Sequence, residues 1–215
     1  MSAKLREEVC LGNQMLPRLG LVTMHSGNVS AIDDLATLVY IKPSGIDFDA
    51  MTPADMVAVS VETGQIESQF KPSVDLPHHL FIYRNMPEVR AVVHTHSNYA
   101  TAFAACHRPI PLVLTAIADE FGGEIPCAPY VGNEGEQIGQ AILRYRNNSP
   151  AILLGNHGVF TWGATVREAL KVAVMVEDVA KTVAISFGLG GPVPISTDEA
   201  AKWFDRYQNR YGQED

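Results

Sequence analysis

Two histidines one residue apart, His94 and His96, lie at the end of the apolar run "AVVHTHSNYA", residues 91–100. In a β-strand, side chains at positions i and i+2 point to the same face, so both imidazoles project together, about 7 Å apart along the strand. Nitrogens placed in this way can converge on one metal ion. For this motif alone, two solvated histidines on an exposed sheet face are the alternative.

Two further candidate ligands strengthen the metal interpretation. His157 in "LLGNHGVF" follows an apolar run and precedes Gly158, which permits a sharp turn or a close backbone approach. Asp75 in "KPSVDLPHH" lies where a helix is predicted to begin. Three histidines and one carboxylate suit a divalent transition metal, with zinc favoured and manganese or cobalt as alternatives. Taken singly, Asp75 also fits a helix N-cap, and His157 fits a buried structural histidine.

The other histidines have weaker patterns. His78 and His79 are consecutive on the predicted helix, so we expect one to be buried and the other exposed. His25 and His107 have no partner pattern and are expected at the surface or outside the ligand set.

Three short segments have the composition of anion-binding turns. They are "SGNVS" (26–30), "KPSG" (42–45) and "KPSVD" (71–75), which combine lysine, hydroxyl groups, an amide and glycine. Backbone N–H groups in such turns suit a phosphate, especially near a helix N-terminus. Each segment is also ordinary turn chemistry, but together they predict a small phosphorylated substrate.

Composition narrows the class of protein. The 215 residues are 47% hydrophobic and 19% charged, which is typical of one globular domain and not of a disordered chain. A net charge of −8 without a basic run argues against nucleic acid or an anionic membrane as the main partner. Three scattered cysteines, no leader-like apolar segment and no apolar run of membrane length predict a cytoplasmic protein.

The hydrophobic periodicity predicts the elements that must position these residues. Helices are expected at residues 3–18, 75–85, 98–106, 133–147, 165–187 and 197–210. Strands are expected at residues 21–33, 37–45, 89–97, 109–115, 123–130 and 151–163, with a hairpin at 56–68. This order predicts an α/β protein: a single three-layer α/β/α domain over residues 1–215, with a central mixed, largely antiparallel sheet.

The motifs resemble those of the class II aldolase family. "GNVS", "KPSG", "KPS-x-D", "VVHTHS", "IPC", "NHG-x-F-x-WG" and "YGQ" occur in that family's order and spacing, from about residue 5 to 213. The similarity is greatest to the L-ribulose-5-phosphate 4-epimerase branch, and the L-fuculose-1-phosphate aldolase branch is more distant. A non-enzymatic module like the adducin head is a third possibility, which retention of the three histidines disfavours.

The resemblance implies a homotetramer with each active site between neighbouring subunits and one divalent ion on His94, His96 and His157. It implies that Asp119, with Thr115 near it, reaches a neighbour's site, and that Tyr211 is the second acid/base group. It implies a phosphate site made by Gly27, Asn28, Lys42, Ser44, Gly45 and Ser73. Lys42 also fits a solvated surface charge.

The implied reaction interconverts L-ribulose 5-phosphate and D-xylulose 5-phosphate by cleaving and remaking the C3–C4 bond. An aspartate at position 75 is epimerase-like, since the aldolases usually have a glutamate there. Two features depart from the epimerase pattern: Val74 replaces a serine, and the tail before Tyr211 lacks a histidine. The stretch "IPCAPYVGNEGEQIG" is more like the aldolases, so a class II sugar-phosphate aldolase is the alternative.

Overall fold

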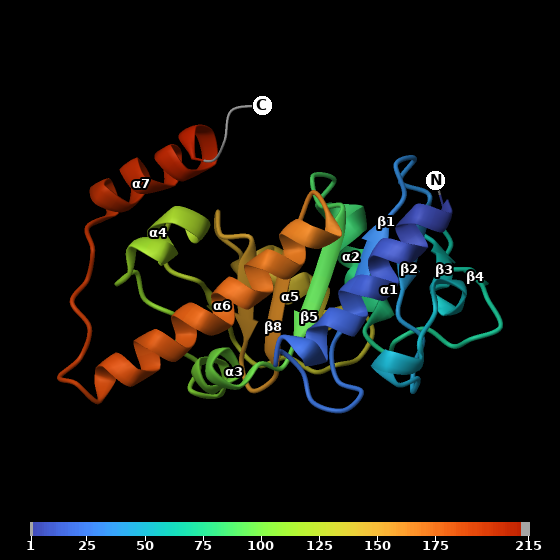
Figure 1. The fold of residues 1–215 in the computed structure, drawn as a ribbon, viewed down its shortest axis with the longest axis horizontal. Coiled ribbons are helices and arrows are strands. Elements are labelled where there is room, and N and C mark those ends of the chain that lie inside the picture. Colours follow the sequence, from blue (N-terminus) through green and yellow to red (C-terminus); the bar gives the residue numbers. More distant parts are fainter. Residues whose placement is uncertain (1, 212–215) are drawn as a thin grey trace.

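The sheet is the central layer of the molecule (Figure 1). In the computed structural model, which describes residues 2–211, its eight strands have the order β4-β3-β2-β1-β5-β8-β7-β6. The strands are β1 (Asn28–Ile32), β2 (Leu38–Ile41), β3 (Val57–Ser60), β4 (Ile66–Glu67), β5 (Ala91–Thr95), β6 (Cys127–Ala128), β7 (Ala151–Leu154) and β8 (Gly158–Gly163). Every neighbouring pair is antiparallel except β6 and β7. The predicted mixed, largely antiparallel sheet is confirmed.

Helices cover both faces of this sheet. They are α1 (Ser2–Arg18), α2 (Leu76–Asn85), α3 (Asn98–Ala105), α4 (Thr115–Phe121), α5 (Gln137–Tyr145), α6 (Val166–Phe187) and α7 (Thr197–Arg210). Short 3₁₀ turns at Phe48–Ala50 and Pro53–Asp55 precede β3. No helix among residues 2–211 has the length and apolar character that crossing a membrane requires.

Alternation along β5 assigns its side chains to the two helical layers. Val92 belongs to the cluster formed with α2 and α5, whereas Ala91 and Val93 belong to the cluster formed with α1 and α6. Because side chains at i and i+2 share a face, His94 points to the α2 side. The strand therefore presents its histidine under the start of α2.

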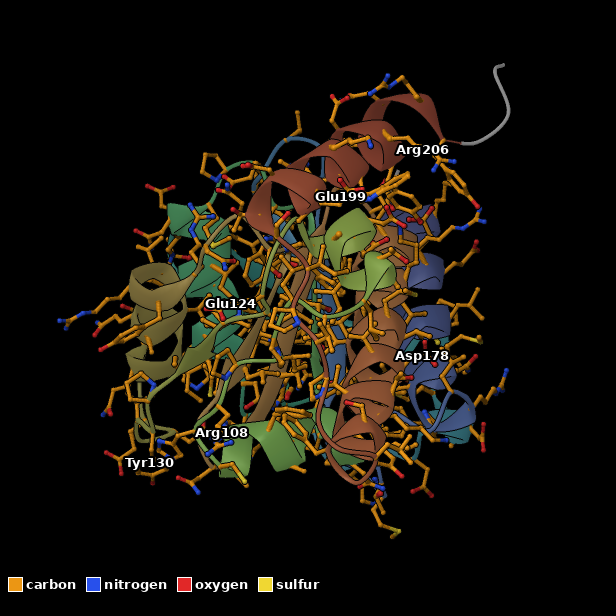
Figure 2. The ribbon with its side chains drawn as sticks, turned by 90° about the vertical axis from the view of Figure 1, so that its left-hand side faces the viewer. Arg108, Glu124, Tyr130, Asp178, Glu199 and Arg206 are labelled. Carbon is orange, nitrogen blue, oxygen red and sulfur yellow. The ribbon has the colours of Figure 1, made fainter. Side chains whose placement is uncertain are left out.

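Helix α7 packs on α4 at one end of the molecule instead of covering the sheet (Figure 1). Figure 2, which is viewed from the left-hand side of Figure 1, shows Glu199 and Arg206 of α7 at the top and Tyr130 at the lower left. The bounds of α7 match the predicted helix, and the Ser196 hydroxyl caps it by accepting from the backbone N–H of Glu199. Helix α6 begins at Val166, one residue after the predicted start, and Thr165 caps it in the same way.

Several predicted strands differ from the observed structure; the one expected at 123–130, for example, is reduced to the two residues of β6. "PIPLVLT" (109–115) has one isolated bridge, between Ile110 and Ile125, because the flanking prolines cannot donate to a ladder. The following residues form α4, a helix that the periodicity did not reveal. The run 151–163 is two strands joined by a turn at Asn156, and the strand predicted at 21–33 is confined to residues 28–32.

Candidate metal and phosphate site

Three histidine side chains meet where β5 ends and β8 begins. One ligand nitrogen from each of His94, His96 and His157 lies within 4.8 Å of the other two. The Nε2 atoms of His94 and His96 are 2.9 Å apart. The ring centroid of His157 lies 4.9 Å from that of His94 and 5.2 Å from that of His96. The arrangement predicted from the spacing of the three histidines is present.

Local backbone geometry brings His157 to the other two. Asn156 adopts a left-handed conformation with φ 57°, and the His157 N–H donates to the Leu154 carbonyl at 3.0 Å. A Cβ atom at Gly158 would lie 2.5 Å from the Thr95 carbonyl oxygen and 2.7 Å from the His96 ring. Only glycine permits this close approach, so the turn depends on the residue that follows His157.

The tautomer of His94 is set by a backbone carbonyl. Its Nδ1 lies 2.9 Å from the Val159 oxygen, which can only accept, so Nδ1 carries the proton. The Nε2 lone pair is then free to coordinate, which is the usual arrangement of a metal-binding histidine. The His94 ring also stacks on Phe160 at a centroid distance of 4.3 Å.

Burial keeps the three imidazoles neutral. It lowers the pKa of His94 to about 3, against an opposing influence from the Asp75 carboxylate. Burial also lowers the pKa values of His96 and His157 below the usual range. Metals bind the neutral imidazole, so these residues have the coordinating form at pH 7. Their nitrogen donors and mutual distances fit a divalent ion such as zinc.

Asp75 lies beside the histidines but outside the group of three. Its carboxylate accepts from Asn28 Nδ2 at 2.6 Å and from Ser73 Oγ at 3.4 Å. The side chain does not cap α2; the Asp75 backbone carbonyl accepts the His78 and His79 N–H groups instead. Burial raises the pKa of Asp75, but the neighbouring histidines and the Asn28 hydrogen bond lower it more, which favours the ionised carboxylate.

The predicted anion-binding residues line the same cavity as the histidines and Asp75. This cavity has a volume of about 320 Å³. Its walls include Gly27, Asn28, Lys42, Ser44, Gly45 and Ser73. Thr115, by contrast, is the first residue of α4 and is not part of this lining.

Two of the three segments are joined by backbone hydrogen bonds. The Ser44 N–H donates to the Lys71 carbonyl at 2.8 Å, and the Ser73 N–H donates to the Lys42 carbonyl at 2.9 Å. Lys42 is buried rather than solvated: its Nζ donates to the His25 carbonyl at 2.8 Å and lies over the Phe48 ring. Burial lowers the pKa of Lys42, while Asp75 acts in the opposite direction.

The first segment contacts the histidine strand directly. Gly27 has φ +76°, and a Cβ atom there would lie 2.8 Å from the His94 carbonyl oxygen. The next residue, Asn28, pairs with His94 in the β1–β5 ladder. The polar turn and the metal-binding strand are therefore held together by the sheet itself.

Both histidines of the "PHH" sequence are buried, so the expectation of one exposed ring is wrong. Helix α2 lies against the sheet and is also covered by α5, which leaves neither ring in solvent. His79 Nδ1 lies 2.7 Å from Ser30 Oγ, and burial lowers the pKa of His79 to about 3. His25 and His107 are exposed, as expected.

Asp119 and Tyr211 lie together, but away from the histidines of their own chain. They border a small cavity of about 100 Å³ with Arg206 and Tyr207, and that lining includes none of the three histidines. Tyr211 is exposed and its ring stacks on Tyr207 at 4.9 Å. Gly212 and Gln213, the rest of the "YGQ" motif, lie outside the described residues.

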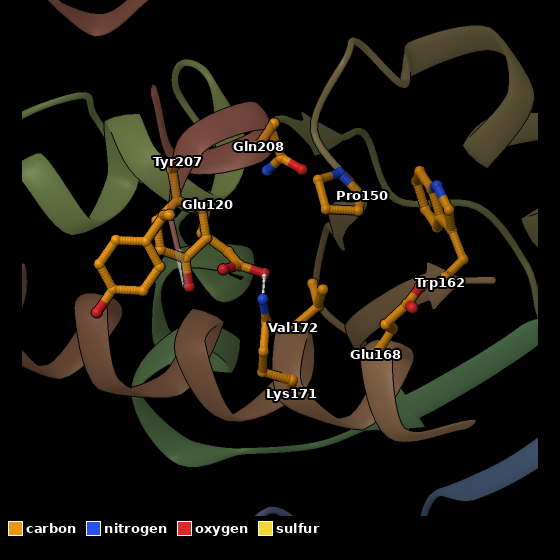
Figure 3. A pocket seen from close by; sticks show the side chains of 10 residues that line it. Glu120, Pro150, Trp162, Glu168, Lys171, Val172, Tyr207 and Gln208 are labelled. Atoms are coloured by element: carbon orange, nitrogen blue, oxygen red, sulfur yellow. Dashed lines mark ion pairs between the residues drawn. The ribbon is translucent and has the colours of Figure 1, made fainter. Parts of the chain in front are cut away.

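A larger cavity beside this pair has a volume of about 420 Å³ and is formed between α4, α6 and α7 (Figure 3). At its centre Lys171 Nζ lies 2.9 Å from a carboxylate oxygen of the buried Glu120. Tyr207 and Trp162 line the same space. No sequence motif marked Glu120 or Lys171, because an ion pair between distant helices has no local pattern.

Comparison with known proteins agrees with the geometry. The model of the family described as "Class II Aldolase and Adducin N-terminal domain" matches residues 7–184. An L-fuculose 1-phosphate aldolase structure is 26% identical, with 95% of this chain and 96% of that chain covered and a TM-score of 0.86. YgbL from Escherichia coli, for which aldolase, epimerase or decarboxylase activity has been suggested, is 26% identical over 94% of this chain and 99% of that chain, with a TM-score of 0.84.

The L-fuculose-1-phosphate aldolase from Thermus thermophilus shares the fold at 23% identity, with 90% of this chain and 100% of that chain covered and a TM-score of 0.75. The family match spans most of the sequence and includes the histidine cluster, Asp75 and the polar turns. This chain therefore belongs to the class II aldolase and adducin N-terminal domain family.

Proposed function

We propose that the protein is a metal-dependent L-ribulose-5-phosphate 4-epimerase that forms D-xylulose 5-phosphate by breaking and remaking the C3–C4 bond. One observation supports this most strongly: three histidines share a single cavity with six predicted anion-binding residues. A metal-binding site next to a phosphate-binding site suits a small phosphorylated ketose.

His94, His96 and His157 would hold one divalent ion, with zinc favoured and manganese or cobalt as alternatives. A bound ion supplies Lewis-acid polarisation of the ketose oxygens, which favours cleavage of the adjacent carbon–carbon bond. Asp75 contributes negative charge beside the histidines, which favours a bound cation, and we retain it as the fourth member of the metal site. Asn28 fixes the position of the Asp75 carboxylate.

The phosphate-binding site would retain the aldehyde fragment until it is added back to the other fragment. Lys42 brings positive charge to the cavity, and Asn28, Ser44 and Ser73 bring neutral hydrogen-bonding groups. If the fragment leaves, the same bond cleavage is an aldol cleavage. Retention of the fragment therefore decides between the two activities.

Inversion at C4 needs one proton-transfer group on each side of the aldehyde, because the hydroxyl oxygen changes sides. We assign these roles to Asp119 and Tyr211, acting in the site of a neighbouring subunit of a homotetramer. Their shared cavity at the α4–α7 end, apart from the histidines of the same chain, supports a joint role.

The second candidate is a class II sugar-phosphate aldolase. A specific observation favours it: the L-fuculose 1-phosphate aldolase structure superposes with a TM-score of 0.86 at 26% identity. In this function the aldehyde produced by cleavage is released, and inversion at C4 is not required.

Product analysis by carbon NMR tests the proposal. The protein is loaded with zinc, manganese or cobalt and incubated with L-ribulose 5-phosphate; the expected product is D-xylulose 5-phosphate. An unchanged substrate, together with cleavage of L-fuculose 1-phosphate, would favour the aldolase. A protein that holds no stoichiometric metal and converts neither compound would contradict both candidates and favour an adducin-like module.

A further inference from the structure

One polar residue of the histidine cavity was not assigned a role by the sequence analysis, although it lies in the stretch "IPCAPYVGNEGEQIG". Asn133 is exposed in the loop between β6 and α5, and it lines the cavity together with His94, His96 and His157. The loop brings this amide to the site from the α5 layer, whereas the other polar walls come from the segments around β1, β2 and α2.

The Asn133 side chain is held by a buried histidine. His78 of α2 is 1% exposed, and its Nε2 lies 2.7 Å from Asn133 Oδ1. An amide oxygen only accepts, so Nε2 carries the proton and Nδ1 is the lone-pair nitrogen. That Nδ1 is buried without a partner among the described residues.

This arrangement directs the donor end of the amide. With Oδ1 bound to His78, the Nδ2 amino group of Asn133 donates to no described residue and remains free at the cavity wall. It offers two neutral N–H donors to oxygen acceptors such as sugar hydroxyl or carbonyl groups.

A purely structural role explains the pair less well. Leucine at position 78 would fill a buried site without leaving an unpartnered nitrogen, and a buried polar atom without a partner lowers stability. The one side-chain hydrogen bond that offsets this cost goes to an exposed group at the site. A histidine at position 78 is therefore best accounted for by the orientation that it imposes on Asn133.

We propose that Asn133 is a specificity-determining substrate contact, which donates to an oxygen of the sugar portion, and that His78 is the positioning residue that orients it. This inference rests on the proposed function, because it assumes a phosphorylated sugar in the histidine cavity. The proposed contact recognises the sugar portion of the substrate, in addition to the proposed metal-binding and phosphate-binding sites.

Steady-state kinetics with L-ribulose 5-phosphate, or with L-fuculose 1-phosphate if only that compound reacts, tests the inference. Asn133→Asp is nearly isosteric but replaces both donors with acceptors, so we expect kcat/KM to fall at least about 10-fold, mainly through KM. Inhibition by inorganic phosphate and the cobalt content should stay within about twofold of wild type, because other residues hold the phosphate and the metal. Gln140→Glu, which adds a charge on the exposed side of α5, is the matched control and should behave as wild type.

Two variants of His78 test its positioning role. His78→Leu removes the hydrogen bond and should raise KM about 5- to 10-fold, whereas His78→Gln keeps an N–H donor and should recover most of the loss. Wild-type kinetics for Asn133→Asp would overturn the substrate contact. Equal defects in both His78 variants, or parallel losses of phosphate inhibition and metal, would assign the pair a structural role. Failure of the wild-type protein to convert either sugar phosphate would instead overturn the proposed function.

Discussion

Individual side chains in this site combine burial with a fixed hydrogen-bond partner. The Val159 carbonyl orients His94, and Asn28 orients the Asp75 carboxylate. The Ser30 hydroxyl forms a hydrogen bond with His79. Burial makes protonation of these imidazoles unfavourable, which keeps their nitrogens available as ligands or acceptors. The protonation states of the site are thus set by packing before any ion or substrate arrives.

Removal of one imidazole should empty the metal site. Loss of a residue that only hydrogen-bonds to a metal ligand lowers metal affinity about 10- to 100-fold. His96→Asn removes one of the three nitrogen ligands themselves, so its metal affinity should fall by more than that. Metal analysis of the dialysed protein measures this change. His25→Asn, a substitution of an exposed histidine outside the group of three, should retain wild-type metal content. Undiminished metal in His96→Asn would mean that the ion binds elsewhere.

His79 should make the metal-free protein sensitive to acid. Its pKa is about 3 in the folded chain, and the unfolded value is 6.5, so between these values the unfolded chain binds more protons. The free energy of unfolding should therefore fall as the pH drops from 6.5 towards 3, by about 1.4 kcal/mol per pH unit from this residue.

Urea unfolding as a function of pH, in the presence of a chelator, isolates the contribution of His79. His79→Gln should reduce the pH slope of the unfolding free energy by close to one proton. An unchanged slope in His79→Gln would show that the folded protein accommodates a charged imidazole at this position.

At the scale of helices and strands, the docking of α7 places Tyr211. The helix packs on α4, and the buried Glu120 of α4 pairs with Lys171 of α6 beneath it. Lys171 Nζ also lies 5.3 Å from the centre of the Tyr207 ring, which stacks on Tyr211 (Figure 3 labels Glu120, Lys171 and Tyr207). Burial lowers the pKa of Lys171, but Glu120 and Tyr207 raise it more, so the ammonium group is retained.

Loss of the lysine should loosen this end of the molecule. Lys171→Met leaves the Glu120 carboxylate buried and unpaired, which should lower the free energy of unfolding by about 1–3 kcal/mol. Urea unfolding measures the loss, and hydrogen exchange in α7 should increase selectively. The double variant Glu120→Gln/Lys171→Met should recover part of the stability, and an equal loss in the double variant would rule out the unpaired charge as the cause.

Local sequence signals predicted long elements better than short ones. Helices α6 and α7 follow from their periodicity, and their observed bounds agree with the predicted ranges to within one residue. Residues 151–163 were expected as one strand, although Gly158 permitted a turn, because apolar runs stand on both sides of "GNHG". The pairing of His78 with Asn133 could not be predicted, since it joins residues that are 55 positions apart.

For the whole molecule, residues expected to serve one reaction lie in two separate places. The histidine cavity lies where β5 ends and β8 begins. Asp119 and Tyr211 lie elsewhere, where α4 packs against α7. The three histidines were predictable because their spacing marks one strand and one turn. Asp119 and Tyr211 depended on the family resemblance, and a single chain does not bring them to the cavity.

Mixed oligomers test whether neighbouring subunits complete the site. Asp119→Asn and His96→Asn should each be inactive alone, the first with its metal retained. After unfolding and joint refolding at equal ratio, about a quarter of the shared sites in a closed ring should combine an intact His96 with a neighbour's intact Asp119. Activity near that level would support the proposed tetramer. Two variants that are each inactive alone and regain no activity on mixing would contradict a shared site and place both residues in sites within one chain.

The register of β5 against β8 also determines when the metal site can exist during folding. Thr95 pairs with Val159, and the His94 ring bonds to the Val159 carbonyl across 65 positions of sequence. Closing so long a loop is a slow, non-local event, so we expect the three nitrogens to converge only after the centre of the sheet has formed. An ion that binds all three nitrogens should therefore slow unfolding far more than it speeds folding, because it stabilises only the fully formed sheet.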